Sequence, residues 1–304
     1  MEILGLDNGY NFTKTSEEVK FLSSIRKGHD VYNDDTLEIE VDGVNYIIGE
    51  KDGTFIADGD KLKTKEGKLN LQITTLAAIA LSFKDKDIID VTPVVGTPVA
   101  YYEDQRDPLY NIIKELDGKA VCINKLDKKQ IIKIKDVLVF PQSAGIVFKK
   151  RLGKENSLVI DIGGGTWDVS QFEGYKLVKK ATYPEGMLIL YSNIAQYLNN
   201  KYYTNYDSSD IYDLIHRDFF SVEGEKKSMK EVEPIIREHT LKVLTKIKRD
   251  FNINGVDNRI AIGGGAEEVK DILVEEIKNI EIEKRADFTN AETFKFIGTL
   301  QLQN

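Results

Sequence analysis

The chain has 304 residues, of which 41% are hydrophobic, so it can bury the core of one large domain or of two domains of about 150 residues each. Its 42 basic and 50 acidic residues leave a net charge of −8; a surface of this balance repels a phosphate backbone, and direct binding of nucleic acid is not expected. One cysteine and three scattered histidines exclude an intramolecular disulfide and lack the spacing of a metal site built from nitrogen or sulfur ligands.

Strands and helices alternate along the chain, which indicates a mixed α/β fold. The first half predicts a strand at 2–7, a hairpin at 36–50 that turns at Asp42-Gly43, a polar loop at 51–70, a helix at 71–83, a buried parallel strand at 88–99, a helix at 103–116, three short strands up to Val139, and a helix from Ser143 to about Lys150.

A polar linker at 151–157 leads to a second group of strands. The patterns predict strands at 158–162, 166–172 and 175–183, a helix at 186–199, a long helix at 229–251, a strand at 259–262, and a last helix at 290–301. Between them, the tyrosine-rich stretch 202–212 and the loop 221–228 show no clear strand pattern.

Both halves contain a strand that ends in aspartate and runs into glycine. ILGLDNGYNFTK carries Asp7 and Lys14, and VIDIGGGTWDV carries Asp161 before three glycines. A glycine turn exposes backbone N–H groups and lets a phosphate approach without meeting a Cβ atom. A carboxylate repels a bare phosphate, so the pairing makes sense with Mg²⁺ between them and with Lys14 as a point charge on the phosphates. The alternative is that each is an ordinary turn after a strand.

A third glycine turn lies in AIGGGAE, at 261–267. No acid precedes it, which suits a wall against an uncharged nucleoside better than a phosphate site; a close packing turn between strand and helix is the alternative. The chain has no GxxxxGK[ST] loop, and no GxGxxG follows a strand, so neither a Walker loop nor a dinucleotide-binding fold is predicted.

In order and spacing, these motifs resemble those of the actin, sugar kinase and heat-shock chaperone superfamily, and within it the bacterial actin-like proteins of the ParM type that segregate plasmids. The resemblance covers nearly the whole chain. The matching segments are LDNGYNFTK and LVIDIGGGTWDV for the two phosphate loops, VFPQSAGIVF and FTNAETFKFIGTLQL for the two connecting helices, and IAIGGGAEEV for the adenosine loop.

The resemblance implies an actin-like two-lobed α/β fold, made of duplicated ribonuclease H-like domains with a nucleotide cleft between the lobes. Domain I would comprise residues 1–152, with an outer subdomain at about 30–90, and would be completed by the C-terminal helix 289–304. Domain II would comprise residues 153–288, and its outer subdomain is not evident from the pattern.

The resemblance also implies that ATP or GTP binds together with Mg²⁺. Asp7 and Asp161 would serve catalysis and hold the metal, with Asp168 as a further metal ligand through water, and Gln142 would position the attacking water. The residues expected to contact the nucleotide are Asn8, Gly9, Tyr10, Asn11, Lys14, Gly163, Gly164, Gly165, Thr166, Glu185, Gly186, Gly263, Gly264, Gly265 and Ala266. Alternatives stay open: Gln142 as a helix cap, Asp168 as an exposed strand acid, and Glu185-Gly186 as an ordinary helix start.

Arg237 and Glu238 in the long helix are candidates to reach the purine, with ordinary surface charge as the alternative. The preference between ATP and GTP stays open.

The function implied is that of a cytoplasmic ATPase that assembles head to tail with itself into filaments. A small DNA-binding adaptor would connect such filaments to plasmid DNA, so contact with nucleic acid would be indirect. The alternative is a small-molecule kinase of the same superfamily, which would need a carboxylate base aimed at an acceptor hydroxyl. A chaperone would need a further peptide-binding domain. A membrane adaptor would need a terminal anchor, and the chain has neither an apolar span nor a signal peptide pattern, so no contact with a membrane is expected.

Overall fold

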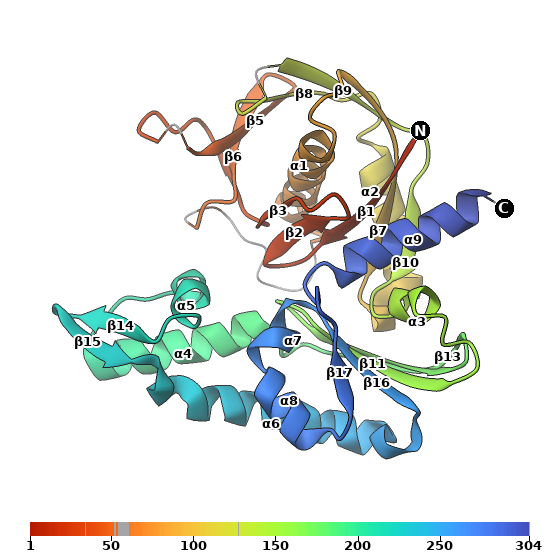
Figure 1. The fold of residues 1–304 in the computed structure, drawn as a ribbon. Coiled ribbons are helices and arrows are strands. Elements are labelled where there is room, and N and C mark those ends of the chain that lie inside the picture. Colours follow the sequence, from red (N-terminus) through yellow and green to blue (C-terminus); the bar gives the residue numbers. More distant parts are fainter. Residues whose placement is uncertain (34, 52, 54–60, 127, 304) are drawn as a thin grey trace.

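The computed structural model describes residues 1–33, 35–51, 53, 61–126 and 128–303. This part of the chain folds into two stacked lobes, each built on a β-sheet with helices packed against it (Figure 1). The mixed α/β class predicted from the sequence is confirmed.

The sheet of the first lobe has ten strands within the described residues. Nine follow the order β3-β2-β1-β7-β9-β8-β5-β6-β4, and β10 pairs with β7. The strands are β1 (Glu2–Asn8), β2 (Phe12–Thr15), β3 (Lys20–Leu22), β4 (Ile25–Lys27), β5 (Leu37–Val41), β6 (Val44–Ile48), β7 (Ile88–Thr97), β8 (Ala120–Ile123), β9 (Lys128–Ile134) and β10 (Leu138–Pro141).

The sheet of the second lobe repeats the central pairing of the first. Its order is β13-β12-β11-β16-β17, with strands β11 (Asn156–Ile162), β12 (Trp167–Glu173), β13 (Lys176–Tyr183), β16 (Asn258–Ile262) and β17 (Ile280–Ile282). β11 is antiparallel to β12 and parallel to β16, as β1 is antiparallel to β2 and parallel to β7. This repetition places the ends of β1 and β11 in equivalent positions.

Local sequence explains the predicted strands that the structure confirms. β7 is almost entirely apolar because it is buried and pairs in parallel with β1, β9 and β10. The hairpin of β5 and β6 turns at Asp42 and Gly43, whose φ angles of 52° and 75° fit a tight two-residue turn.

The helices that pack on the first lobe are α1 (Lys65–Ser82), α2 (Tyr102–Lys114) after the short 3-10 helix η1 (Val99–Tyr101), α3 (Gly145–Lys149) and α9 (Thr289–Gln303). α1 begins six residues before the predicted start, because Thr64 caps it by accepting a hydrogen bond from the Gly67 N–H. The predicted loop 51–70 is therefore too long; residues 52 and 54–60 of it lie outside the described part of the chain.

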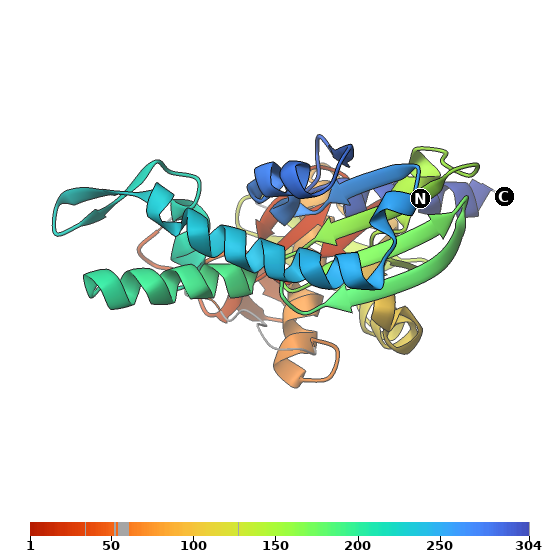
Figure 2. The same cartoon turned by 90° about the horizontal axis from the view of Figure 1, so that it is seen from below.

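The second lobe carries two long helices side by side, α4 (Met187–Tyr202) and α6 (Glu233–Asp250), which extend beyond the sheet in the view from below (Figure 2). Two elements that the sequence did not indicate cover their far ends: α5 (Ser208–Leu214), which starts with a capping box at Asp207, and the hairpin of β14 (Phe219–Val222) and β15 (Glu225–Ser228). Shorter helices complete this lobe: η2 (Met229–Val232), η3 (Ile253–Gly255), α7 (Gly264–Glu268) and α8 (Lys270–Glu276).

The long helix predicted at 229–251 begins four residues later in the structure than in the prediction. Residues 229–232 form the 3-10 helix η2, and α6 starts at Glu233 with Pro234 in its first turn. Proline lacks the N–H that an earlier α-helical turn would need, and its ring clashes with the carbonyl group four residues before it. The apolar spacing therefore predicts the helix, and Pro234 sets where it begins.

α3 and α9 meet at the boundary of the two lobes, where α3 packs against the face of the second sheet that is turned to the first lobe and α9 lies against β1 (Figure 1). Glycine makes the crossing of α9 and β1 possible: a Cβ atom on Gly5 would lie 1.8 Å from the carbonyl oxygen of Ala291. The backbones of β1 and α9 are therefore in direct contact.

We expect Gly5→Ala to lower the free energy of unfolding by about 3 kcal/mol or more, because backbone rather than a flexible side chain must move. Gly224→Ala is the matched control: its φ is +84° in open space, so the loss should be about 1 kcal/mol. Urea unfolding of both variants measures the difference, and equal losses would contradict the close crossing.

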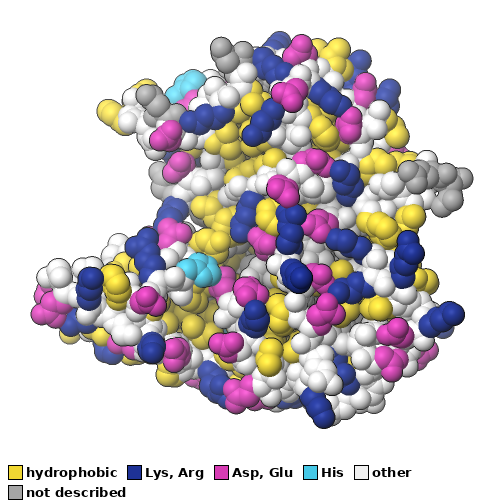
Figure 3. Space-filling model, in the orientation of Figure 1, with side chains coloured by type: hydrophobic (Ala, Val, Ile, Leu, Met, Phe, Trp, Pro, Cys, Tyr) yellow, Lys and Arg dark blue, Asp and Glu magenta, His cyan; other side chains and the backbone are white. Residues whose placement is uncertain are grey.

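The face shown in Figure 3 carries basic and acidic side chains intermixed rather than a patch of one sign. None of the helices in the described ranges is long and apolar enough to cross a membrane.

Candidate functional site

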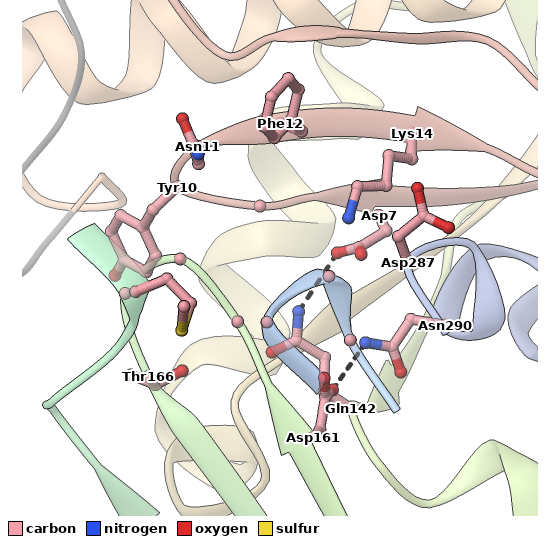
Figure 4. A pocket seen from close by; sticks show the side chains of 18 of the residues that line it. Asp7, Tyr10, Asn11, Phe12, Lys14, Gln142, Asp161, Thr166, Asp287 and Asn290 are labelled. Atoms are coloured by element: carbon pink, nitrogen blue, oxygen red, sulfur yellow. Dashed lines mark hydrogen bonds between the residues drawn. The ribbon is translucent and has the colours of Figure 1, made fainter. Parts of the chain in front are cut away.

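A cleft of about 610 Å³ opens between the lobes, and the glycine turns that follow β1 and β11 line it. Most of the residues singled out from the sequence line it: Asp7, Asn8, Gly9, Tyr10, Asn11, Lys14, Gln142, Asp161, Gly163, Gly164, Gly165, Thr166, Asp168, Gly263, Gly264 and Gly265. Figure 4 shows how the labelled side chains from the two lobes converge. The topology explains the convergence, because β1 and β11 hold equivalent positions in their sheets.

The glycine turns of the two lobes touch each other. A Cβ atom on Gly164 would lie 2.9 Å from Cβ of Asn11, and one on Gly165 would lie 2.5 Å from the ring of Tyr10. Side chains at these positions would therefore push the lobes apart. The turns line the cleft mainly with backbone, as a group that must be approached closely by N–H donors requires.

Asp7 stands at the end of β1 and is almost fully buried. The side-chain amide of Gln142 donates a hydrogen bond of 3.3 Å to its Oδ1 atom (Figure 4). Burial raises the pKa of Asp7, and the positive charges of Lys14 and Lys61 oppose that rise. The neighbouring lysines and Gln142 therefore do not fully offset the cost of burying the charge of this carboxylate.

Asp161 occupies the equivalent position at the end of β11. Asn290, in the first turn of α9, donates a hydrogen bond of 2.6 Å to its Oδ2 atom (Figure 4). Burial, followed by repulsion from Asp168, raises the pKa of Asp161 to about 7. Asp7 also repels Asp161. A divalent cation between Asp7 and Asp161 would offset both the cost of their burial and their mutual repulsion, so the pair fits a cation site.

Asp168 is buried, so the alternative of an exposed strand acid is wrong. Its carboxylate accepts hydrogen bonds from the Thr182 and Thr166 hydroxyls and from the N–H of Val99, at 2.5, 2.7 and 3.1 Å. Thr182 belongs to the second lobe and Val99 to the first. In this arrangement Asp168 links the two lobes, and three of its acceptor positions are occupied.

Two lysines of the cleft bring positive charge close to Asp7. Lys14 is the one predicted from the sequence, and it is buried beside Asp7. Lys61 was missed, because it follows a polar stretch that gives no pattern. Its ammonium group hydrogen-bonds the carbonyl oxygen of Asn8 and lies 4.9 Å from the ring centre of Tyr10. Burial lowers the pKa of Lys61 to about 8.

Three residues expected to contact the nucleotide are not part of the described lining of the cleft. Glu185 forms an ion pair with Lys246, and its carbonyl oxygen is 3.0 Å from Nε2 of His239, so it fastens the start of α4 to α6. Gly186 packs against the second glycine turn, where a Cβ atom would lie 2.3 Å from the carbonyl oxygen of Gly164. Ala266 is fully buried in α7. Of these, Gly186 supports the turn most directly.

The long helix contributes no side chain to the described lining of the cleft. Arg237 instead forms two hydrogen bonds with Glu275 of α8, at 2.7 and 2.9 Å. This observation favours the reading of Arg237 as surface charge. The far end of the cleft is lined by other residues, notably Tyr191, Tyr212, His216 and Glu268.

Comparison with known proteins identifies the architecture. Residues 5–145 match the family model described as the actin-like proteins N-terminal domain. A comparison with curated proteins gives no match. Among solved structures, an archaeal actin homologue superposes with a TM-score of 0.80 at 18% identity, covering 99% of this chain and 100% of that one.

A ParM protein from a 15-stranded filament of Clostridium botulinum superposes with a TM-score of 0.81 at 18% identity, covering 99% of this chain and 100% of that one. An archaeal actin homologue in complex with ADP gives 0.77 at 16% identity, with coverage of 99% and 100%. The actin-like two-lobed fold predicted from the motifs is confirmed.

Proposed function

We propose, for a chain that carries the N-terminal domain of the actin-like proteins and has the actin-like fold throughout, that the cleft binds and hydrolyses a purine nucleoside triphosphate, ATP or GTP, with Mg²⁺. The observation that carries this proposal is the convergence of Asp7 and Asp161, each beside a glycine turn, on one cleft between the lobes. The ADP bound to one structural neighbour supports it.

The residues fit distinct roles in such a site. Backbone N–H groups of the glycine turns and the ammonium group of Lys14 would hold the phosphates. Asp7 and Asp161 would hold Mg²⁺ through its water ligands. The metal would neutralise charge on the phosphates during transfer.

Gln142 would orient the attacking water. Its amide nitrogen donates to Asp7, which leaves the amide oxygen able to accept a hydrogen bond from a water molecule. An amide orients water but cannot take up its proton, so hydrolysis should be slow. Slow hydrolysis suits a filament whose lifetime is set by the rate at which its bound nucleotide is hydrolysed.

Turnover would reach the rest of the molecule through α3 and α9. Asn290 of α9 binds Asp161, and Gln142 lies just before α3. A change in the charge held at the two aspartates would therefore act on both elements that connect the lobes.

We further propose that this movement controls head-to-tail self-assembly into filaments, as the filament formed by one structural neighbour suggests. Segregation of plasmid DNA in the cytoplasm through a small DNA-binding adaptor is the corresponding role. Domain boundaries near residues 152 and 288 would then separate the moving lobes, with the C-terminal helix returning to the first.

The experiment combines light scattering and pelleting with each triphosphate, in Mg²⁺ or in a chelator, followed by electron microscopy. We expect polymer and phosphate release with a triphosphate and Mg²⁺, and neither in the chelator. Calorimetry that detects no uptake of any purine triphosphate would overturn the proposal. In a parallel incubation with a metabolite pool, a phosphorylated acceptor would favour the kinase alternative.

A further inference from the structure

The far end of the cleft contains a buried carboxylate that the proposed hydrolysis does not use. Glu268 ends α7, the helix that follows the third glycine turn, and its side chain is only 10% exposed. It lines the cleft together with Tyr191 of α4, Tyr212 of α5 and His216. The aspartates of the proposed metal site lie near the ends of β1 and β11, so Glu268 calls for a separate explanation.

The hydrogen-bonding capacity of Glu268 is only partly used. Its two carboxylate oxygens lie 2.7 and 2.6 Å from the hydroxyl group of Tyr191, which has a single proton to donate. The nearest nitrogen of His216 is 3.9 Å away, too far for a hydrogen bond. Among the residues that the structure describes, no second donor reaches this carboxylate, and a buried carboxylate without its hydrogen bonds is costly.

Aromatic rings surround the same place. Tyr212 lies edge to face with Tyr191 and with His216, at centroid distances of 6.1 and 5.5 Å, and its ring is 4.9 Å from that of Phe12 in the opposite lobe. Flat apolar walls with one strong acceptor group at their edge suit a heteroaromatic base that presents hydrogen-bond donors.

We propose that Glu268 reads the purine base and that its carboxylate selects guanine over adenine. This inference rests on the proposed nucleotide site. Guanine presents two adjacent donors, N1–H and the 2-amino group, which match the two oxygens of a carboxylate. Adenine presents one donor beside the N1 acceptor, which a carboxylate repels.

The charge of Glu268 gives the selection a pH dependence. Burial raises the pKa of Glu268 to about 7, while the hydroxyl group of Tyr191 and the charge of Lys20 from the first lobe oppose that rise. His216 lies 3.9 Å from the carboxylate, and burial lowers the pKa of His216; Tyr212 packs against the His216 ring. On its own side, Glu267 is paired with Lys270. Above about pH 7 the carboxylate is ionised, so the preference for guanine should increase from pH 6 to pH 8.

The experiment compares binding of GTP, ITP and ATP, each with Mg²⁺, by calorimetry. ITP differs from GTP only by the missing 2-amino group. A hydrogen bond to a charged group contributes about 1.5–3 kcal/mol, so wild-type protein at pH 8 should bind GTP at least about tenfold more tightly than ITP, and more tightly than ATP. In Glu268→Gln the ratio of GTP to ITP affinity should fall to about threefold or less, because a neutral amide makes the weaker bond.

Asp271→Asn is the control, because it removes the same charge at an exposed position three residues away and should keep the wild-type ratio. If Glu268→Gln binds triphosphates with an unchanged ratio, or if wild-type protein prefers ATP, the role of Glu268 is wrong while the proposed function stands. If wild-type protein binds none of the three nucleotides, the proposed function itself fails.

Discussion

Replacing Asp161 by asparagine should abolish Mg²⁺-dependent turnover, with a loss of about a thousandfold or more. The carboxylate is the group at the end of β11 that would hold the metal's water ligands, and the neutral amide cannot supply that charge. The isosteric variant keeps the shape of the site, and Asn290 can still donate its hydrogen bond to the new amide oxygen. Phosphate release under saturating nucleotide measures the effect, and turnover near the wild-type rate would remove Asp161 from the site.

The same substitution should stabilise the protein when nucleotide and metal are absent. The pKa of Asp161 is about 7 in the fold against an ordinary value of 3.8. A raised pKa means that stability is fully present below about pH 4 and is lost as the pH rises through about 7. The wild type should therefore lose about 2 kcal/mol more unfolding free energy than Asp161→Asn between pH 5 and pH 8.

Urea unfolding in a chelator at the two pH values tests this difference, and the comparison with the variant cancels the titration of all other groups. Equal losses would show that Asp161 is not held in an unfavourable charge state. Nucleotide with Mg²⁺ should then raise the stability of the wild type more than that of the variant, because the ion offsets the repulsion only where the carboxylate is present.

Much of the fold was predictable because its signals are local. The glycine turns at the ends of β1 and β11, the hairpin at Asp42-Gly43 and the apolar strand β7 each depend on a few consecutive residues. The errors have local causes too. Thr64 as an N-cap and Pro234 in a first turn are both helix-start signals that are visible in the sequence.

The missing parts of the site depend on contacts between distant residues. Asn290 reaches Asp161 across 129 positions of the chain, and Lys61 reaches Asn8 across 53. No periodicity or spacing in a single sequence indicates such pairs. Glu268 is similar: it follows a recognised glycine turn, but its burial against Tyr191 and the rings of α5 arises only when α4, α5 and α7 pack together.

Replacing Gln142 by alanine should slow hydrolysis about a hundredfold while nucleotide affinity changes only a few-fold. The reason is that water, phosphates, metal and base would each contact different residues of the cleft. Gln142 is fixed by its hydrogen bond to Asp7 and by its backbone N–H, which donates to the carbonyl oxygen of Thr97 at 2.9 Å. The alanine variant keeps the backbone bond and loses only the group that would orient water. Phosphates, metal and base would still meet their own partners.

The Gln142→Ala protein should therefore assemble like the wild type but disassemble more slowly. Filaments should form with triphosphate and Mg²⁺ at the wild-type concentration and then persist, because the step that resets the lobes is slow. Gln142→Asn gives a second test: it keeps the amide but shortens the side chain by one methylene group, so it should hydrolyse as slowly as the alanine variant. Single-turnover phosphate release, followed with light scattering in the same sample, measures both quantities. The structure does not support the alternative of Gln142 as a helix cap, because α3 has Ala144 at its N-cap and no side-chain cap. Release at the wild-type rate in both variants would show that Gln142 only holds Asp7 through its hydrogen bond and takes no part in the chemical step.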